Sequence, residues 1–263
     1  MFLALILVVV IVTGAFVIFK KKVKLQNNNR SEPSQVMIEK DKQVEIERVS
    51  LKTDDGVEII ADFTQIRGSQ FAGILLHMMP ADRASWAPLA ARLNQAGYST
   101  LSLDLRGHGE SINSAKGKLD YRKFSDSEHQ ASKFDVVAAS NFLKSHEFAL
   151  KNQFLVGASV GANLALQFLS ENQEVKAVVL LSPGLNYRGI LTEPLGKEDY
   201  GDKIMLVAAT DDTYSAATVK TLKTKAKTAE LLLYPDGGHG TDILRNQKEA
   251  IEKVINWLKG KLI

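Results

Sequence analysis

From about residue 72 onward, short apolar runs alternate with segments of helical periodicity, and this alternation limits the possible folds. The run at 72–78 (AGILLHM) is continuously apolar, as in a parallel strand buried on both faces. The segment at 85–97 has helical apolar spacing and ends at Gly97, a residue that commonly terminates helices. The pattern predicts further strands at 98–105, 154–158, 175–182, 203–209 and 229–235, and helices at 131–146, 160–172, 213–226 and 243–262. Repeated strand–helix units predict a mostly parallel central sheet with helices on both faces.

Two further strands are predicted ahead of this series. Residues 44–51 and 57–63 alternate apolar and polar side chains, as half-exposed strands do. The turn sequence TDDG at 53–56 joins them, which predicts an antiparallel hairpin. We therefore expect a mixed sheet and place one globular domain at 44–263.

The first 43 residues differ from the rest of the chain. Residues 2–19 carry no charge and only Thr13 as a polar side chain, and at ~1.5 Å per residue they match the ~30 Å hydrocarbon core of a bilayer. No basic residue precedes this run and a lysine cluster follows it, which favours an uncleaved transmembrane helix over a signal peptide. We expect an anchor with a basic flank at 1–24 and a polar linker at 25–43. Because positive flanks stay in the cytoplasm, the prediction is a single-pass membrane protein with a cytoplasmic domain.

Charge and cysteine content exclude several classes of protein. The net charge of the chain is +3, and five positive charges lie at Lys20, Lys21, Lys22, Lys24 and Arg30, so the chain from residue 31 onward carries 3 − 5 = −2. A slightly acidic domain offers no basic face for nucleic acid. The absence of cysteine excludes disulfides, thiolate metal sites and a cysteine nucleophile.

The sequence Gly157-Ala158-Ser159-Val160-Gly161 lies between a predicted strand and a predicted helix. This is a G-x-S-x-G pattern in the strand–turn–helix setting that places a serine hydroxyl on a sharp turn above a sheet. The turn lies at the N-terminus of a helix, where a developing anion is stabilised. The pattern predicts Ser159 as a nucleophile.

The domain resembles the α/β-hydrolase superfamily over nearly all of 44–263. Besides the serine motif, the resemblance rests on the block 81–111, which ends in LDLRGHGES. In that superfamily the residues matching Asp104, Arg106 and Gly107 brace the edge of the site, and the one matching His108 is structural. The subgroup most similar in style contains esterases, dienelactone hydrolases and S33 peptidases. The interval 181–203 is too short for a helical cap, so we expect no sizeable cap domain and an open site.

The resemblance implies a base and an acid that follow the nucleophile in the order Ser, Asp or Glu, His. His239 is the only histidine after Ser159, and its turn, 236–242, follows the last predicted strand. Asp211 and Asp212 both follow the strand before it. The spacing in similar families favours Asp212 as the acid, which leaves Asp211 as a possible helix cap.

The resemblance also implies two backbone donors for an oxyanion hole. One is the N–H of Val160, directly after the nucleophile. The other lies in the loop His77-Met78-Met79-Pro80, where Met78 replaces the glycine common in the superfamily. We expect the donor to be Met79, with Met78 as the alternative, and we expect His77 to support the loop. On the opposite wall, Tyr187 or Leu185 is expected to contact the substrate.

These features predict a serine hydrolase, carboxylesterase-like, that cleaves an ester or thioester through an acyl-enzyme without metal or cofactor. The partners expected are a small-molecule ester or acyl substrate and, through the N-terminal segment, a membrane. Alternatives on the same three residues are an S33-type aminopeptidase, an acyltransferase and a perhydrolase. A different alternative is a catalytically silent membrane-tethered scaffold, although such proteins usually lack one of the three residues.

Overall fold

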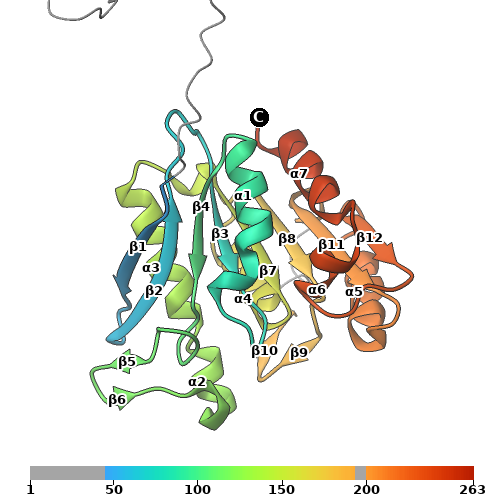
Figure 1. Cartoon of the computed structure of the whole chain (residues 1–263). Coiled ribbons are helices and arrows are strands. Elements are labelled where there is room, and N and C mark those ends of the chain that lie inside the picture. Colours follow the sequence, from blue (N-terminus) through green and yellow to red (C-terminus); the bar gives the residue numbers. More distant parts are fainter. Residues whose placement is uncertain (1–44, 193–199) are drawn as a thin grey trace, which may run out of the picture. The chain divides into compact units, whose positions relative to one another are not determined.

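A computed structural model describes residues 45–192 and 200–263, and residues Gln43–Ile263 form one compact unit. Its centre is a mixed sheet whose strands run in the order β12-β11-β8-β7-β3-β4-β2-β5-β6, with β1 paired to β2 (Figure 1). The antiparallel strands are β1 (Glu47–Lys52), β2 (Val57–Thr64), β5 (Asn113–Ser114) and β6 (Gly117–Lys118). The parallel strands are β3 (Ala72–Leu76), β4 (Ser99–Leu103), β7 (Gln153–Ala158), β8 (Ala177–Leu181), β11 (Ile204–Ala209) and β12 (Glu230–Tyr234).

Burial along the strands follows the sequence pattern. Every residue of β3 and β8 is buried, as expected of continuously apolar parallel strands. In β2, buried and partly buried residues alternate, because one face of this strand is less completely covered. The predicted mixed sheet is therefore confirmed.

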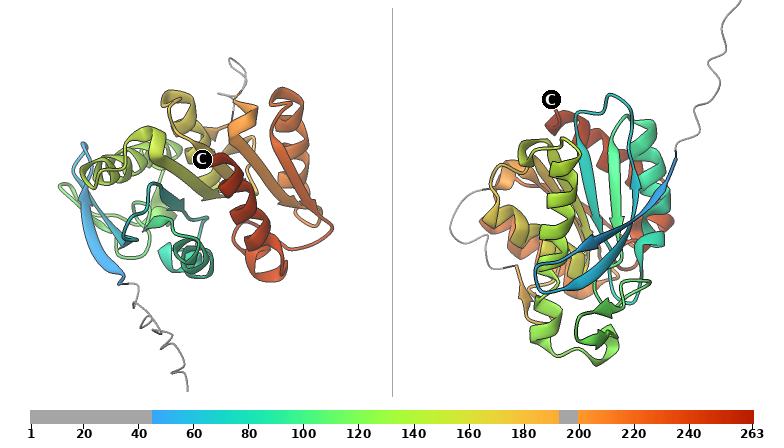
Figure 2. Two further views of the ribbon diagram at one scale, coloured as in Figure 1. Left: turned by 90° about the horizontal axis from the view of Figure 1, so that it is seen from above. Right: turned by 90° about the vertical axis from the view of Figure 1, so that its left-hand side faces the viewer.

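Helices cover both faces of the sheet and bury two apolar clusters (Figure 2). On one face lie α3 (Lys133–Ser145), α4 (Val160–Glu171) and α5 (Thr213–Lys225). On the other lie α1 (Ala87–Gln95), α6 (Asp242–Asn246) and α7 (Ala250–Lys261). Burying both faces holds the strands in register and fixes the turns at their carboxyl ends.

Two segments differ from the elements predicted for them. The region 106–130, for which no strand or helix is predicted above, contains β5, β6, the 3-10 turn η2 (Tyr121–Lys123) and a short helix, α2 (Asp126–Gln130). This helix begins with a capping box formed by Ser125 and Glu128. The single helix predicted at 243–262 is divided into α6 and α7. The break lies at Gln247, whose backbone is extended and whose side-chain amide donates to Asp236. This contact ties the break to the turn that carries His239.

The interval 181–203 contains a small hairpin that the sequence pattern did not predict. Its strands, β9 (Asn186–Tyr187) and β10 (Ile190–Leu191), lie below the carboxyl ends of the main sheet, beside α2 (Figure 1). Residues 193–199 lie outside the described part of the chain.

The predicted fold needs correction at the N-terminus. Across residues 45–192 and 200–263 the structure contains no helix with the length and apolar character needed to span a membrane, so the predicted transmembrane helix is not supported. The apolar run at 2–19 on which that prediction was based lies outside the described residues. The prediction was based on the hydropathy of this run and on the lysines that follow it.

Candidate active site

Ser159 occupies a strained turn between β7 and α4. Its backbone dihedrals are φ 54° and ψ −118°, a conformation that costs a non-glycine residue on the order of 1–3 kcal/mol. The Ser159 N–H donates to the carbonyl of Leu181 at 2.8 Å, which helps to hold the turn. A Cβ atom at Gly157 would overlap the carbonyl of Gly161, and one at Gly161 would overlap the carbonyl of Leu76. The glycines of the motif are therefore required by close backbone approach.

His239 is paired with Asp212 at the same end of the sheet. The Nδ1 atom of His239 lies 2.6 Å from Oδ2 of Asp212, while Oδ1 of Asp212 accepts the backbone N–H of Ser215 at the start of α5. Burial alone would raise the pKa of Asp212, but hydrogen bonds from Ser215 and His239 outweigh it, and the pKa is lowered. Asp212 is thus an ionised partner that orients the imidazole ring.

Asp211 has a different position from its neighbour. Its carboxylate accepts the backbone N–H groups of Gly237 (3.1 Å) and Gly238 (3.1 Å), two residues of the turn before His239. The helix cap suggested for Asp211 is also provided by Asp212. Of the two aspartates, Asp212 contacts the histidine ring and Asp211 anchors the histidine turn.

Tyr187, on the β9–β10 hairpin, lies between the serine and the histidine. Its ring meets the His239 ring edge to face at a centroid distance of 6.1 Å, and its hydroxyl lies 3.1 Å from Oγ of Ser215. Burial raises the pKa of Tyr187, and hydrogen bonds with the Ser215 and Ser159 hydroxyls partly offset that rise. Tyr187, expected from the sequence as a substrate contact, thus joins the elements that carry Ser159 and His239.

The loop after β3 lies over the start of α4. His77 is fully buried, with Nδ1 2.8 Å from the carbonyl of Met78 and Nε2 accepting the N–H of Leu105 at 2.9 Å. Burial lowers the pKa of His77 to about 4, so its ring is neutral, which suits loop support. Within the described residues, the N–H groups of Met79 and Val160 donate to no protein acceptor and are available to a ligand.

The segment Asp104–His108 braces this loop from the side. Asp104 is fully buried and accepts hydrogen bonds from the backbone N–H (2.8 Å) and the guanidinium of Arg83. Arg106 is held by buried Asp135 and by Asp55. His108 stacks on Tyr121 and burial lowers its pKa to about 4, consistent with a structural role. Arg83 and Asp135 were not identified from the sequence, because their partners are distant in the chain.

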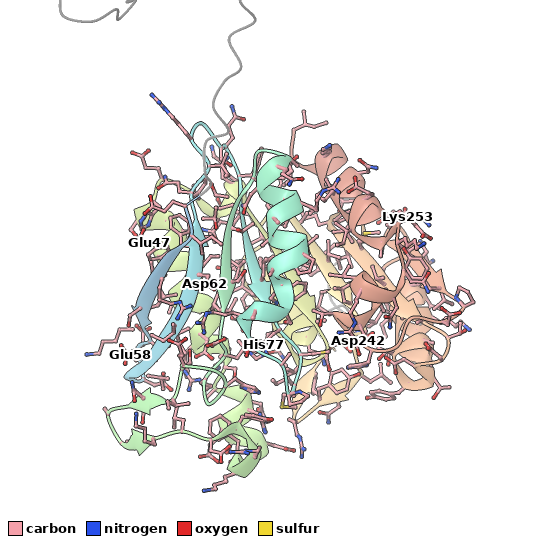
Figure 3. All side chains as sticks on the ribbon, in the orientation of Figure 1. Glu47, Glu58, Asp62, His77, Asp242 and Lys253 are labelled. Atoms are coloured by element: carbon pink, nitrogen blue, oxygen red, sulfur yellow. The ribbon has the colours of Figure 1, made fainter. Side chains whose placement is uncertain are left out.

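Figure 3 places this region within the molecule. His77, at the end of β3, and Asp242, at the start of α6, lie toward the lower end of the sheet, whereas Glu47, Glu58 and Asp62 lie on β1 and β2 at its left edge. No group of three or more metal-binding side chains occurs in the part of the chain that the structure describes.

Ser182, directly after β8, supports the histidine turn and was also missed from the sequence. It is fully buried with φ 49°, and its Oγ accepts the N–H of Gly240 at 2.9 Å.

We expect Ser182→Ala to lower kcat about tenfold or more, with a smaller change in KM. The reason is that an unsatisfied buried N–H costs about 1–3 kcal/mol and that the His239 turn loses this support. Ser182→Gly is the control, since it removes the hydroxyl and relieves the positive φ. Unchanged kcat in both variants, measured on a neutral ester, would contradict this role.

Comparison with known proteins places the fold. Residues 74–198 match the family model described as serine aminopeptidase, S33. No curated protein matches the chain in sequence. Among solved structures, an esterase from Pyrococcus furiosus is 20% identical with a TM-score of 0.70, covering 84% of this chain and 94% of that one. Dienelactone hydrolase from Anabaena variabilis is 17% identical with a TM-score of 0.60, covering 83% and 97% of the two chains. An esterase from Exiguobacterium antarcticum is 16% identical with a TM-score of 0.60, covering 80% and 99%. Likeness at these identities establishes a shared fold. It confirms the predicted α/β-hydrolase fold with a mixed sheet, but not the transmembrane helix predicted before it.

Proposed function

We propose that this chain, which has the α/β-hydrolase fold, is a serine hydrolase that cleaves a carboxylic ester or thioester through an acyl-enzyme. The proposal assigns Ser159 as nucleophile, His239 as general base and Asp212 as the acid that orients the base. Its main support is the 2.6 Å contact between His239 and Asp212 at the sheet end where Ser159 occupies a strained turn. A serine hydroxyl is a weak nucleophile until such a base takes its proton.

In the proposed reaction, Oγ of Ser159 attacks the substrate carbonyl while its proton passes to Nε2 of His239. The new oxyanion accepts hydrogen bonds from the N–H groups of Val160 and Met79. When the intermediate collapses, the bond to the leaving oxygen or sulfur breaks, and His239 protonates that atom. A water molecule, deprotonated by His239, then attacks the acyl-enzyme and releases the acid and free Ser159. The hydrogen-bonded Asp212 carboxylate stabilises the imidazolium of His239 that forms in both halves of the reaction.

An S33-type aminopeptidase is the second candidate, because the S33 family model matches residues 74–198. The same three residues would then cleave an amide bond next to a free amino terminus. Such a substrate carries a positive charge and calls for an acidic anchor near the nucleophile. Aminoacyl-methylcoumarin amides compared with esters of the same acids distinguish the two candidates, since an aminopeptidase needs the free amine and an esterase does not.

The first test uses the purified full-length chain and a fluorophosphonate probe, which labels only activated serines. We expect one label, located on Ser159 by peptide mass spectrometry, together with hydrolysis of p-nitrophenyl acetate, butyrate or octanoate. The series of acyl lengths measures how much of the acyl chain the site accepts. Absence of both labelling and ester hydrolysis would contradict the proposed function and favour a non-catalytic role.

A further inference from the structure

A pocket of about 310 Å³ lies next to the proposed oxyanion donor. It is lined by the Met79–Pro80 turn, by Tyr121, Arg122, Phe124 and His129, and by Arg188 at the tip of the β9–β10 hairpin. These residues come from the segments that follow β3, β4 and β8. In Figure 1, the elements β9, β10 and α2 gather at the carboxyl end of the sheet. The pocket thus lies at the end of the sheet that carries Ser159.

The hairpin that carries Arg188 is held rigidly to the helix after the nucleophile. Asn163, fully buried on the first turn of α4, donates to the carbonyls of Gly184 (2.8 Å) and Ile190 (2.7 Å) and accepts the N–H of Gly184. The ring of Tyr187, next to Arg188, packs edge to face against the His239 ring, and its hydroxyl lies 3.1 Å from Oγ of Ser215. Arg188 thus belongs to the hairpin that places Tyr187 against the proposed base.

Arg188 is exposed at the rim of this pocket. Its side chain forms no ion pair within the described residues, whereas Arg122, the other arginine of the pocket, is paired with Asp120 at 2.8 Å. Two acids of α2 lie on this side of the molecule: the Glu128 carboxylate is hydrogen-bonded to Ser125, and Asp126 lies close to Gly189, the residue after Arg188. An unpaired guanidinium beside a cavity presents a fork of donors that matches a carboxylate.

None of the described residues that line the pocket is acidic, while Asp126 and Glu128 lie close enough to act on His129. Burial lowers the pKa of His129, and the positive charge of Arg188 lowers it further, while Asp126 and Glu128 act in the opposite direction. His129 lies against the Phe124 ring at a centroid distance of 5.3 Å. The pocket therefore combines aromatic and neutral walls with a cationic rim, which suits a short chain ending in an anion.

We propose that the substrate carries a negatively charged group, of the carboxylate type, a few bonds from the scissile carbonyl, and that Arg188 binds this group. The proposal rests on the hydrolase function proposed above and specifies its substrate class. Half-esters of short dicarboxylic acids have the required chemistry. The same charge repels a free amino terminus, so this pocket favours an esterase over an aminopeptidase.

The test compares monoethyl glutarate with ethyl pentanoate, which have the same chain length and differ in the terminal carboxylate, by measuring released ethanol with the full-length chain. We expect a higher kcat/KM for the half-ester, and we expect Arg188→Gln to lower that preference about tenfold. Arg67→Gln is the matched control, because Arg67 is an exposed arginine in the turn before β3, at the opposite end of the sheet. The preference should also fall as the ionic strength rises from about 0.02 M to about 0.5 M, because salt screens an exposed charge.

A binding measurement separates failure of this proposal from failure of the hydrolase function. Monoethyl glutarate is titrated by calorimetry into the full-length Ser159→Ala chain and into the same chain with Arg188→Gln. Binding that weakens about tenfold in the double variant supports the anion site whether or not an ester is hydrolysed. Equal binding, or a catalytic preference that Arg188→Gln and Arg67→Gln change to the same extent, would overturn it.

Discussion

Ser159→Ala should lower the turnover of any ester substrate about 10⁶-fold. Removing the nucleophile of a catalytic triad has an effect of this size, because the remaining histidine and acid cannot form an acyl-enzyme. The measurement is the initial rate of p-nitrophenyl ester hydrolysis together with fluorophosphonate labelling, both of which should disappear. The loss should appear in kcat, since the substituted hydroxyl contributes to the transition state and little to binding.

The variant should fold normally, and this distinguishes loss of chemistry from loss of structure. The backbone of Ser159 donates to Leu181 and accepts from Ala162 and Asn163, and alanine retains all of these bonds, although it must adopt the same positive φ. Ser215→Ala offers a control of the same chemical change nearby, because Ser215 is fully buried and its hydroxyl contacts Tyr187. If Ser159→Ala kept more than about a hundredth of the activity, Ser159 would not be the nucleophile.

The fold and the central residues could be predicted because they depend on local patterns. Apolar runs such as AVVLL, within the strand predicted at 175–182, are typical of buried parallel strands, and the structure places β8 (Ala177–Leu181) at that run. Gly157 and Gly161 mark a turn where no side chain fits, so the position of Ser159 follows from neighbouring residues. The structure also brings together Asp212 and His239, the pair that chain order and spacing favoured.

What could not be predicted depends on contacts between distant segments. Ser182 lies 58 positions from Gly240, and nothing near it in the sequence indicates that its hydroxyl accepts a turn N–H. The hairpin with Tyr187 has strands too short for a periodic signal, and its position is set by Asn163 on another element. The break between α6 and α7 similarly depends on Gln247 reaching Asp236. These contacts act through tertiary packing, which overrides local periodicity.

Asp212→Asn should lower kcat about 10⁴-fold, while Asp211→Asn should lower it less than about tenfold. An amide at position 212 retains a good helix cap but can stabilise neither the imidazolium nor the required tautomer of His239. At position 211 an amide oxygen still accepts from the N–H groups of Gly237 and Gly238, so the turn keeps its shape. Each variant removes one negative charge, and the two positions are adjacent in the chain. A difference in kcat between the variants therefore cannot result from the loss of charge or from the location alone.

The measurement is kcat and KM for one neutral ester at several pH values, with thermal unfolding to confirm that both variants fold. Since the pKa of Asp212 is lowered in the folded chain, its contribution to stability is present above its unfolded pKa and is lost as the pH falls through its folded pKa. Asp212→Asn should therefore weaken the dependence of stability on pH in the acidic range. If Asp211→Asn had the larger effect on kcat, the carboxylate that holds the turn would be the one the reaction needs, and Asp212 would be only the cap of α5.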